Sequence, residues 1–115
     1  MKKLTVLLLL MTLMMGCAND STDDLTVAPP AVITYQKDVR TIMNQSCATS
    51  GCHNVASNSA GLTLETYTQV RNAFETRGAL NRMESATNSM PPQGNLPEPT
   101  LNIIRTWITN GYIEN

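Results

Sequence analysis

Two cysteines and a histidine stand close together in the segment Cys47-Ala48-Thr49-Ser50-Gly51-Cys52-His53. His53 is the only histidine in the chain. Two thiols followed at once by an imidazole are the groups that covalent haem attachment requires, because the thiols add to the two porphyrin vinyl groups and the imidazole binds iron. The segment therefore predicts one covalently bound haem c, with thioethers at Cys47 and Cys52 and with His53 on the iron.

The spacing of the two cysteines differs from the usual attachment motif. Cys-x-x-Cys-His has two residues between the cysteines, whereas four separate Cys47 from Cys52. Since the porphyrin fixes the distance between the vinyl groups, the additional residues must bulge away between the two anchors. The spacer residues are small, and Gly51 can adopt backbone angles that are closed to other residues. The longer spacer is therefore compatible with attachment.

Two other uses of these side chains stay open. A Cys47–Cys52 disulfide would close a small loop and leave His53 as an ordinary exposed side chain; the protein would then be a disulfide-stapled interaction module without haem. A structural zinc site is the second alternative. It needs four ligands, and this segment offers only three.

The first 16 residues have the pattern of a secretory signal. Met1-Lys2-Lys3 is basic, residues 4–15 are almost entirely apolar, and Gly16 is small. The apolar run is too short to span a bilayer. Its ending in Gly16-Cys17 resembles a bacterial lipoprotein signal, which implies cleavage before Cys17 and lipidation of that residue. An ordinary signal peptide that leaves Cys17 as a spare cysteine is the alternative.

Residues 17–31 are acidic and then proline-bearing, which predicts a flexible tether. Export places the protein outside the cytoplasm, where paired thiols are oxidised or consumed by a cofactor. We therefore expect an extracytoplasmic protein that is lipid-anchored to a bacterial membrane, on its periplasmic face or at the outer membrane and cell surface. Without residues 1–16 the chain has a net charge of about −3, which does not favour nucleic-acid binding.

Residues 32–115 are long enough for one small domain. Such a domain buries little apolar surface and usually needs a staple. A buried haem would supply one, because its apolar face gives short helices something to pack on. The aromatic side chains of this part number only five: Tyr35, Tyr67, Phe74, Trp107 and Tyr112.

Helical periodicity predicts the secondary structure of this domain. Thr34 precedes a helix expected over residues 35–46, and Thr63 is the expected cap of a helix over residues 64–77 that stops at Gly78. No sustained alternation of apolar and polar residues occurs, so we expect no β-sheet and assign the domain to the all-α class.

Two further helical segments follow. A short one over residues 79–84 turns Met83 inward, and a longer one over residues 97–110 has the clearest apolar stripe of the chain. The stripe includes Trp107. We expect Trp107 in the core, and the alternative is an indole N–H that reaches a haem propionate.

Met90 lies in the rigid segment Ser89-Met90-Pro91-Pro92. A residue before proline is held in an extended conformation, so this segment cannot curl into a helix. Because a thioether sulfur is a soft ligand for haem iron, Met90 is predicted to bind the open side of the iron. Met83 is the second candidate, and a methionine that merely fills an apolar gap is the third possibility.

Taken in order, these segments resemble a small single-haem class I cytochrome c over residues 34–112. The match consists of the helix that leads into Cys47, the Cys52-His53 pair, Met90-Pro91-Pro92, and Ile103–Gly111. The resemblance implies an all-α fold in which the first and last helices cross around one haem. It also implies His53 as the proximal ligand, Met90 as the distal ligand, and thioethers at Cys47 and Cys52.

The same resemblance implies a function. With both axial positions filled, iron has no site for substrate, so the expected activity is outer-sphere transfer of single electrons rather than catalysis. The expected partners are redox proteins and the membrane, with no small-molecule substrate. An accessory electron-entry subunit of a larger oxidoreductase complex is an alternative. If Met90 does not bind, a haem sensor or a peroxidase-like protein is the alternative.

Overall fold

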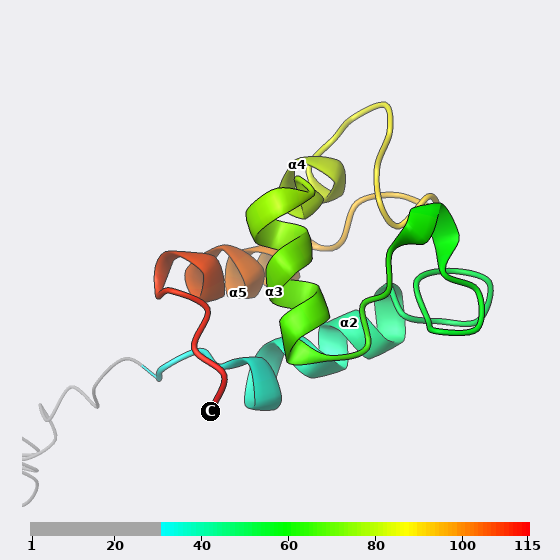
Figure 1. Ribbon diagram of the computed structural model, residues 1–115. Helices are drawn as coiled ribbons and strands as arrows, with labels where there is room; N and C mark the ends of the chain where they lie inside the picture. The colour runs from blue at the N-terminus through cyan, green and yellow to red at the C-terminus, as the bar shows by residue number, and fades with distance from the viewer. Residues whose placement is uncertain (1–30) are drawn as a thin grey trace, which may run out of the picture. The chain divides into compact units, whose positions relative to one another are not determined.

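Residues 31–115, which the computed structural model describes, fold into helices and loops and contain no β-strand (Figure 1). The predicted all-α class is confirmed for this part of the chain. The compact unit that these helices form is Val32–Asn115. The predicted signal peptide, the predicted lipidation site Cys17 and the predicted tether up to residue 30 lie outside the described residues. Within residues 31–115, no helix is both long and apolar enough to span a bilayer.

The first helix begins at the predicted cap. Thr34 Oγ1 accepts a hydrogen bond from the Lys37 amide at 3.3 Å, and Asp38 Oδ2 accepts one from the Thr34 amide at 2.9 Å. The first five residues, η1 (Tyr35–Val39), form a π-helical turn in which the Arg40 amide bonds to the Tyr35 carbonyl. The α-helix α2 (Arg40–Ser46) continues it and delivers the chain to Cys47.

The second helix starts later than predicted. α3 (Tyr67–Thr76) is capped by Thr66, whose Oγ1 accepts from the Gln69 amide at 3.3 Å, while Gln69 Oε1 accepts from the Thr66 amide at 3.1 Å. The prediction that Thr63 caps this helix was wrong, because this reciprocal capping box satisfies two amides at once. The predicted stop at Gly78 is confirmed, with the glycine in the left-handed conformation at φ 65°.

Two helices complete the domain: α4 (Ala79–Met83) and α5 (Glu98–Thr109). Pro97 and Pro99 flank the start of α5, where a missing N–H costs nothing. The predicted apolar stripe of α5 faces inward, with Leu101, Ile104 and Trp107 buried.

The buried core joins residues from every α-helix of the described chain. α5 packs against η1, and the segment after α5 pairs with the start of η1: the Tyr35 amide donates to the Ile113 carbonyl at 2.8 Å. Figure 1 shows this return of the C-terminus (red) to the beginning of the first helix (cyan). The core cluster is Tyr35, Val39, Met43, Cys47, Leu64, Val70, Ala73, Met83, Leu101, Ile104 and Trp107.

Trp107 lies at the centre of the aromatic side chains. Its ring centroid is 5.0 Å from that of Tyr112, 5.9 Å from Phe74, 6.0 Å from Tyr35 and 6.4 Å from Tyr67. Its indole Nε1–H donates to the Ile113 carbonyl at 2.9 Å. The expected core position of Trp107 is confirmed, and the alternative role at a propionate is excluded because a backbone carbonyl already uses the N–H.

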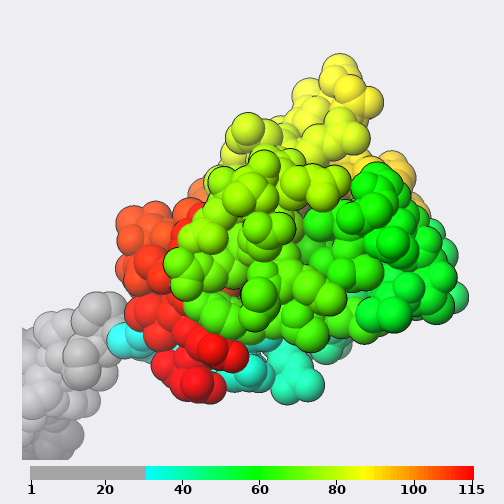
Figure 2. All heavy atoms as spheres, in the orientation of Figure 1, coloured from blue at the N-terminus to red at the C-terminus, as the bar shows by residue number. Residues whose placement is uncertain are grey.

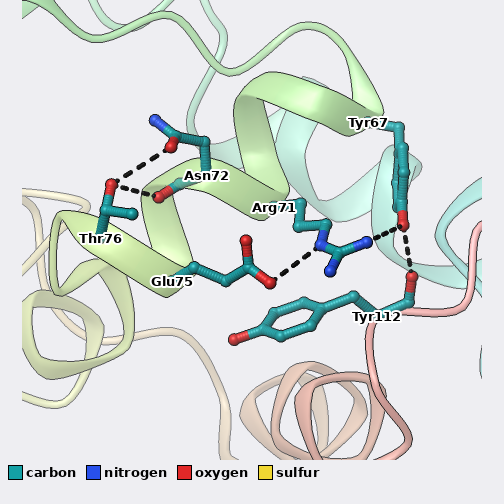
Figure 3. A network of polar contacts seen from close by, with 6 residues as sticks. All are labelled: Tyr67, Arg71, Asn72, Glu75, Thr76 and Tyr112. Carbon is teal, nitrogen blue, oxygen red and sulfur yellow. Dashed lines mark hydrogen bonds and ion pairs between the residues drawn. The ribbon is translucent and has the colours of Figure 1, made fainter.

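A polar network ties α3 to the segment after α5 (Figure 3). Arg71 donates through Nη1 to the Tyr67 hydroxyl at 3.3 Å and through Nε to Glu75 Oε1 at 2.9 Å. The Tyr67 hydroxyl donates to the Tyr112 carbonyl at 2.7 Å, and the Arg71 guanidinium lies 5.5 Å from the centre of the Tyr112 ring. These contacts hold Tyr112 at φ 61°, a conformation that non-glycine residues rarely adopt.

Candidate cofactor site

A cavity of about 600 Å³, partly open to solvent, is lined by the end of α2, the segment that follows it, α4 and the loop around Met90. This volume lies within the range of about 300–1,000 Å³ that is common for small-molecule and cofactor sites. In Figure 2, the loop after α4 (yellow) projects from the surface above the segment that follows the cysteines (green). The walls include every residue that the sequence predicted for the site in this part of the chain: Cys47, Cys52, His53, Met90 and the second candidate Met83.

The backbone around the two cysteines forms a closed loop. The His53 amide donates to the Cys47 carbonyl at 3.0 Å, and the Cys52 amide donates to the Thr49 carbonyl at 3.0 Å. Gly51 has φ 81°, which explains the need for glycine at that position. Ser50 is exposed, whereas Thr49 and Gly51 line the cavity, so only part of the four-residue spacer points away from it.

The His53 ring is held by one hydrogen bond. Its Nδ1 lies 3.1 Å from the Leu62 carbonyl oxygen, which can only accept, so Nδ1 carries the proton. In the neutral imidazole this leaves the lone pair on Nε2, the atom that remains free to bind a metal. The Leu64 amide also donates to the His53 carbonyl at 2.8 Å. The segment after the motif therefore fixes both the backbone and the tautomer of His53.

Cys47 and Cys52 are both free thiols. The disulfide alternative is therefore not found in this structure. Burial, with a smaller contribution from Cys52, raises the pKa of the Cys47 thiol to about 11. Cys47 is accordingly a neutral thiol at neutral pH, and a neutral thiol is a poor metal ligand and a poor nucleophile in disulfide exchange.

The donor side chains do not converge on one point. No group of three or more His, Cys, Asp or Glu side chains in residues 31–115 is arranged to hold a metal ion. This counts against the zinc alternative, which needs four ligands around a single ion. Thiols, imidazole and thioethers spread over the walls of a largely apolar cavity instead suit a larger group that brings its own metal. The residues present therefore fit a covalently bound haem.

Met90 and Met83 both line this cavity, from neighbouring positions in the backbone. The Met90 amide donates to the Arg82 carbonyl at 2.9 Å, which places Met90 beside the end of α4. Met83, the last residue of α4, is buried with 4% of its surface exposed, whereas Met90 is half-buried. The structure brings both thioether candidates to the site.

Two arginines at the site were missed in the sequence. Arg77 and Arg82 line the cavity, and Arg77 Nη2 lies 3.4 Å from the Ala60 carbonyl. Neither forms an ion pair within the described residues, and no Asp or Glu lines the cavity. The sequence does contain one indication of these arginines. Residues 41–64 and 85–97, which supply most of the cavity walls, contain no Asp, Glu, Lys or Arg, so they offer no acidic partner to a nearby arginine. The two guanidinium groups are thus available to anionic groups of a ligand.

No protein-family model, no curated protein and no solved structure matches this chain.

Proposed function

We propose that this chain is a membrane-tethered c-type cytochrome with the fold of a small class I cytochrome c, which carries single electrons by outer-sphere transfer. One observation carries the proposal. One cavity of about 600 Å³ is lined by two thiols, by the only imidazole of the chain, and by two thioethers from a distant part of the sequence. These are the donor types that attach a haem and bind both sides of its iron.

Each side chain has a role in this proposal. Cys47 and Cys52 would hold the haem through thioether bonds, His53 would bind its iron through Nε2, and Met90 would be the second protein ligand, through its sulfur. Arg77 and Arg82 are placed to pair with the carboxylates of the cofactor. When bound, the haem supplies a one-electron couple between ferrous and ferric iron.

The ligand set favours electron carriage over catalysis. With His53 and Met90 both bound to the iron, the haem would have no position for a substrate. The thioether ligand and the apolar walls formed by residues such as Leu62 and Leu64 disfavour the extra positive charge of the ferric state. We therefore expect a relatively high reduction potential and redox proteins as partners.

The N-terminal part of the proposal concerns residues outside the described structure. Residues 1–16 would direct export, Cys17 would carry the lipid, and residues 17–31 would tether the domain to a bacterial membrane. A lipid anchor confines the search for a redox partner to the membrane surface, and stable anchoring requires more than one acyl chain. Co-purification after mild membrane extraction would show whether the chain is an independent carrier or an accessory subunit of an oxidoreductase complex.

The test is the visible absorption spectrum of the protein made with a cytochrome c maturation system. Sharp reduced bands that stay with the polypeptide after denaturation and solvent extraction are expected, together with a weak far-red band of the oxidised form from an iron–thioether bond. A variant in which Cys47 and Cys52 are both replaced by serine should lose the haem on extraction.

Two results would contradict this function. A colourless protein would exclude a cytochrome and favour the disulfide-stapled module, which thiol reductants should then destabilise. Carbon monoxide binding by the reduced protein would reveal an open iron position, and would favour a haem sensor or a peroxidase-like protein instead.

A further inference from the structure

Met83 and Met90 reach the cavity from the same wall. The Arg82 carbonyl that accepts the Met90 amide, at 2.9 Å, belongs to the peptide bond that leads into Met83. The backbones of the two methionines are therefore neighbours, although seven positions separate them in the sequence. Both methionines also line the cavity.

The two methionines differ in how firmly they are held. Met83 is buried in the core at the end of α4. Met90 is half-buried in a loop whose hydrogen bonds are mostly internal, such as those to the Ser85 hydroxyl and the Pro91 carbonyl. Between residues 85 and 96, the bond from the Met90 amide to Arg82 is the one hydrogen bond that leads to another part of the described chain. Segments with so few attachments open locally at low cost in free energy.

We infer that Met83 is a reserve thioether ligand, able to occupy the same iron position when Met90 leaves it. This inference rests on the proposed function. In the exchange, the iron–sulfur bond to Met90 breaks and one to Met83 forms. Both ligands are neutral thioethers, so no proton or electron is transferred. The exchange should therefore be independent of pH, and it keeps the iron closed to external ligands while the loop is open.

Other side chains are poor candidates for this replacement. The described residues contain a single lysine, Lys37 in η1, and no histidine except His53, and Lys37 does not line the cavity. Arg77 and Arg82 line it but do not lose their proton in proteins. Met43 is fully buried on α2 and lies outside the cavity walls. Met83 is the remaining soft donor at the site.

The experiment compares Met90→Leu, Met83→Leu and the double variant, with Met43→Leu as the matched control. Leucine conserves volume, so the variants should fold; Met90→Ala is a second variant at the loop position. The readouts are the far-red band of the oxidised protein and carbon monoxide binding by the reduced protein. Both are measured between about pH 5 and pH 9, below the ordinary pKa of lysine.

We expect each single variant to keep the far-red band and to exclude carbon monoxide at every pH, as Met43→Leu does. The double variant should lose the band and bind carbon monoxide. If Met90→Leu and Met90→Ala already lose the band and bind carbon monoxide, the inference is wrong while the proposed function stands. If Met83→Leu alone loses the band, Met83 and not Met90 is the iron ligand, so both the inference and the assignment of Met90 are wrong, while covalent haem and electron carriage stand. Absence of covalent haem from the unmodified protein would refute the proposed function itself.

Discussion

His53 Nδ1 lies 3.1 Å from the Leu62 carbonyl oxygen, so the backbone nine residues later selects the tautomer of the only histidine in the chain. A carbonyl oxygen cannot donate, and the proton must therefore sit on Nδ1. An oriented imidazole is a better metal ligand than a freely rotating one, because its lone pair already points in a fixed direction. The site therefore has one preorganised nitrogen donor.

In the proposed haem protein, replacing this histidine should remove the iron–nitrogen bond but leave the haem attached. In His53→Ala we expect haem that survives solvent extraction, since Cys47 and Cys52 remain, but with a high-spin spectrum. Asn54→Ala, at the next position, should keep the unmodified spectrum. A low-spin spectrum in His53→Ala that matches the unmodified protein would mean that His53 is not an iron ligand.

The Cys47 thiol makes the stability of the haem-free protein depend on pH. Its folded pKa is raised from 9.0 to about 11 by burial and, less, by Cys52. A folded pKa above the unfolded one gives a stabilising contribution that is complete below pH 9 and is lost as pH rises through 11. We expect the free energy of unfolding to fall by about 2 kcal/mol by pH 11.

Urea unfolding of the haem-free protein between pH 8 and pH 11 measures this loss. Cys47→Ala is the control, and its unfolding free energy should not show the same fall. Iodoacetamide should also modify the half-buried Cys52 before the buried Cys47 at pH 8. Rapid modification of Cys47 at that pH, with the fold intact, would contradict its raised pKa.

Local sequence signals predicted most of the helical fold. Thr34 and Gly78 marked helix ends because a side-chain cap and a left-handed glycine act through neighbouring residues only. The start of α3 was predicted three residues too early, since Thr63 and Thr66 are both possible caps. The Gln69 side chain decides between them by closing the capping box at Thr66.

The site was predictable only in part, because a cavity wall is made by distant segments. The adjacent residues Cys52 and His53 could be predicted because they form part of a motif. Met90 could be predicted because the prolines that follow it restrict its backbone. Arg77 lies at the end of α3 and Arg82 lies in α4, and both line the cavity. They could not be predicted as site residues, because helical periodicity does not tell which face of a helix packs against a distant loop. The bond between the Met90 amide and the Arg82 carbonyl likewise depends on tertiary packing.

Loss of the hydroxyl group should change the free energy of unfolding differently at two tyrosines, the half-buried Tyr67 and the buried Tyr35. The Tyr67 hydroxyl donates to the Tyr112 carbonyl at 2.7 Å, so Tyr67→Phe should lower the free energy of unfolding by about 1 kcal/mol. The Tyr35 hydroxyl is buried and has no hydrogen-bond partner among residues 31–115, so Tyr35→Phe should be neutral or stabilising. Urea unfolding of both variants tests this contrast. Equal destabilisation would show that the Tyr35 hydroxyl does have a partner, such as a buried water.

The two arginines at the cavity should raise the reduction potential of the haem protein. A positive charge near iron disfavours the ferric state more than the ferrous state, so Arg77→Gln and Arg82→Gln should each lower the potential. The effect should stay within about 1 kcal/mol, because both side chains are exposed to water. Arg40→Gln removes the same charge from an exposed position on α2 that does not line the cavity, and it should have a smaller effect. Redox titration at low and high salt measures all three variants. If all three variants lower the reduction potential equally, and high salt abolishes all three changes, then Arg77 and Arg82 act only as distant surface charges and do not contact the cofactor.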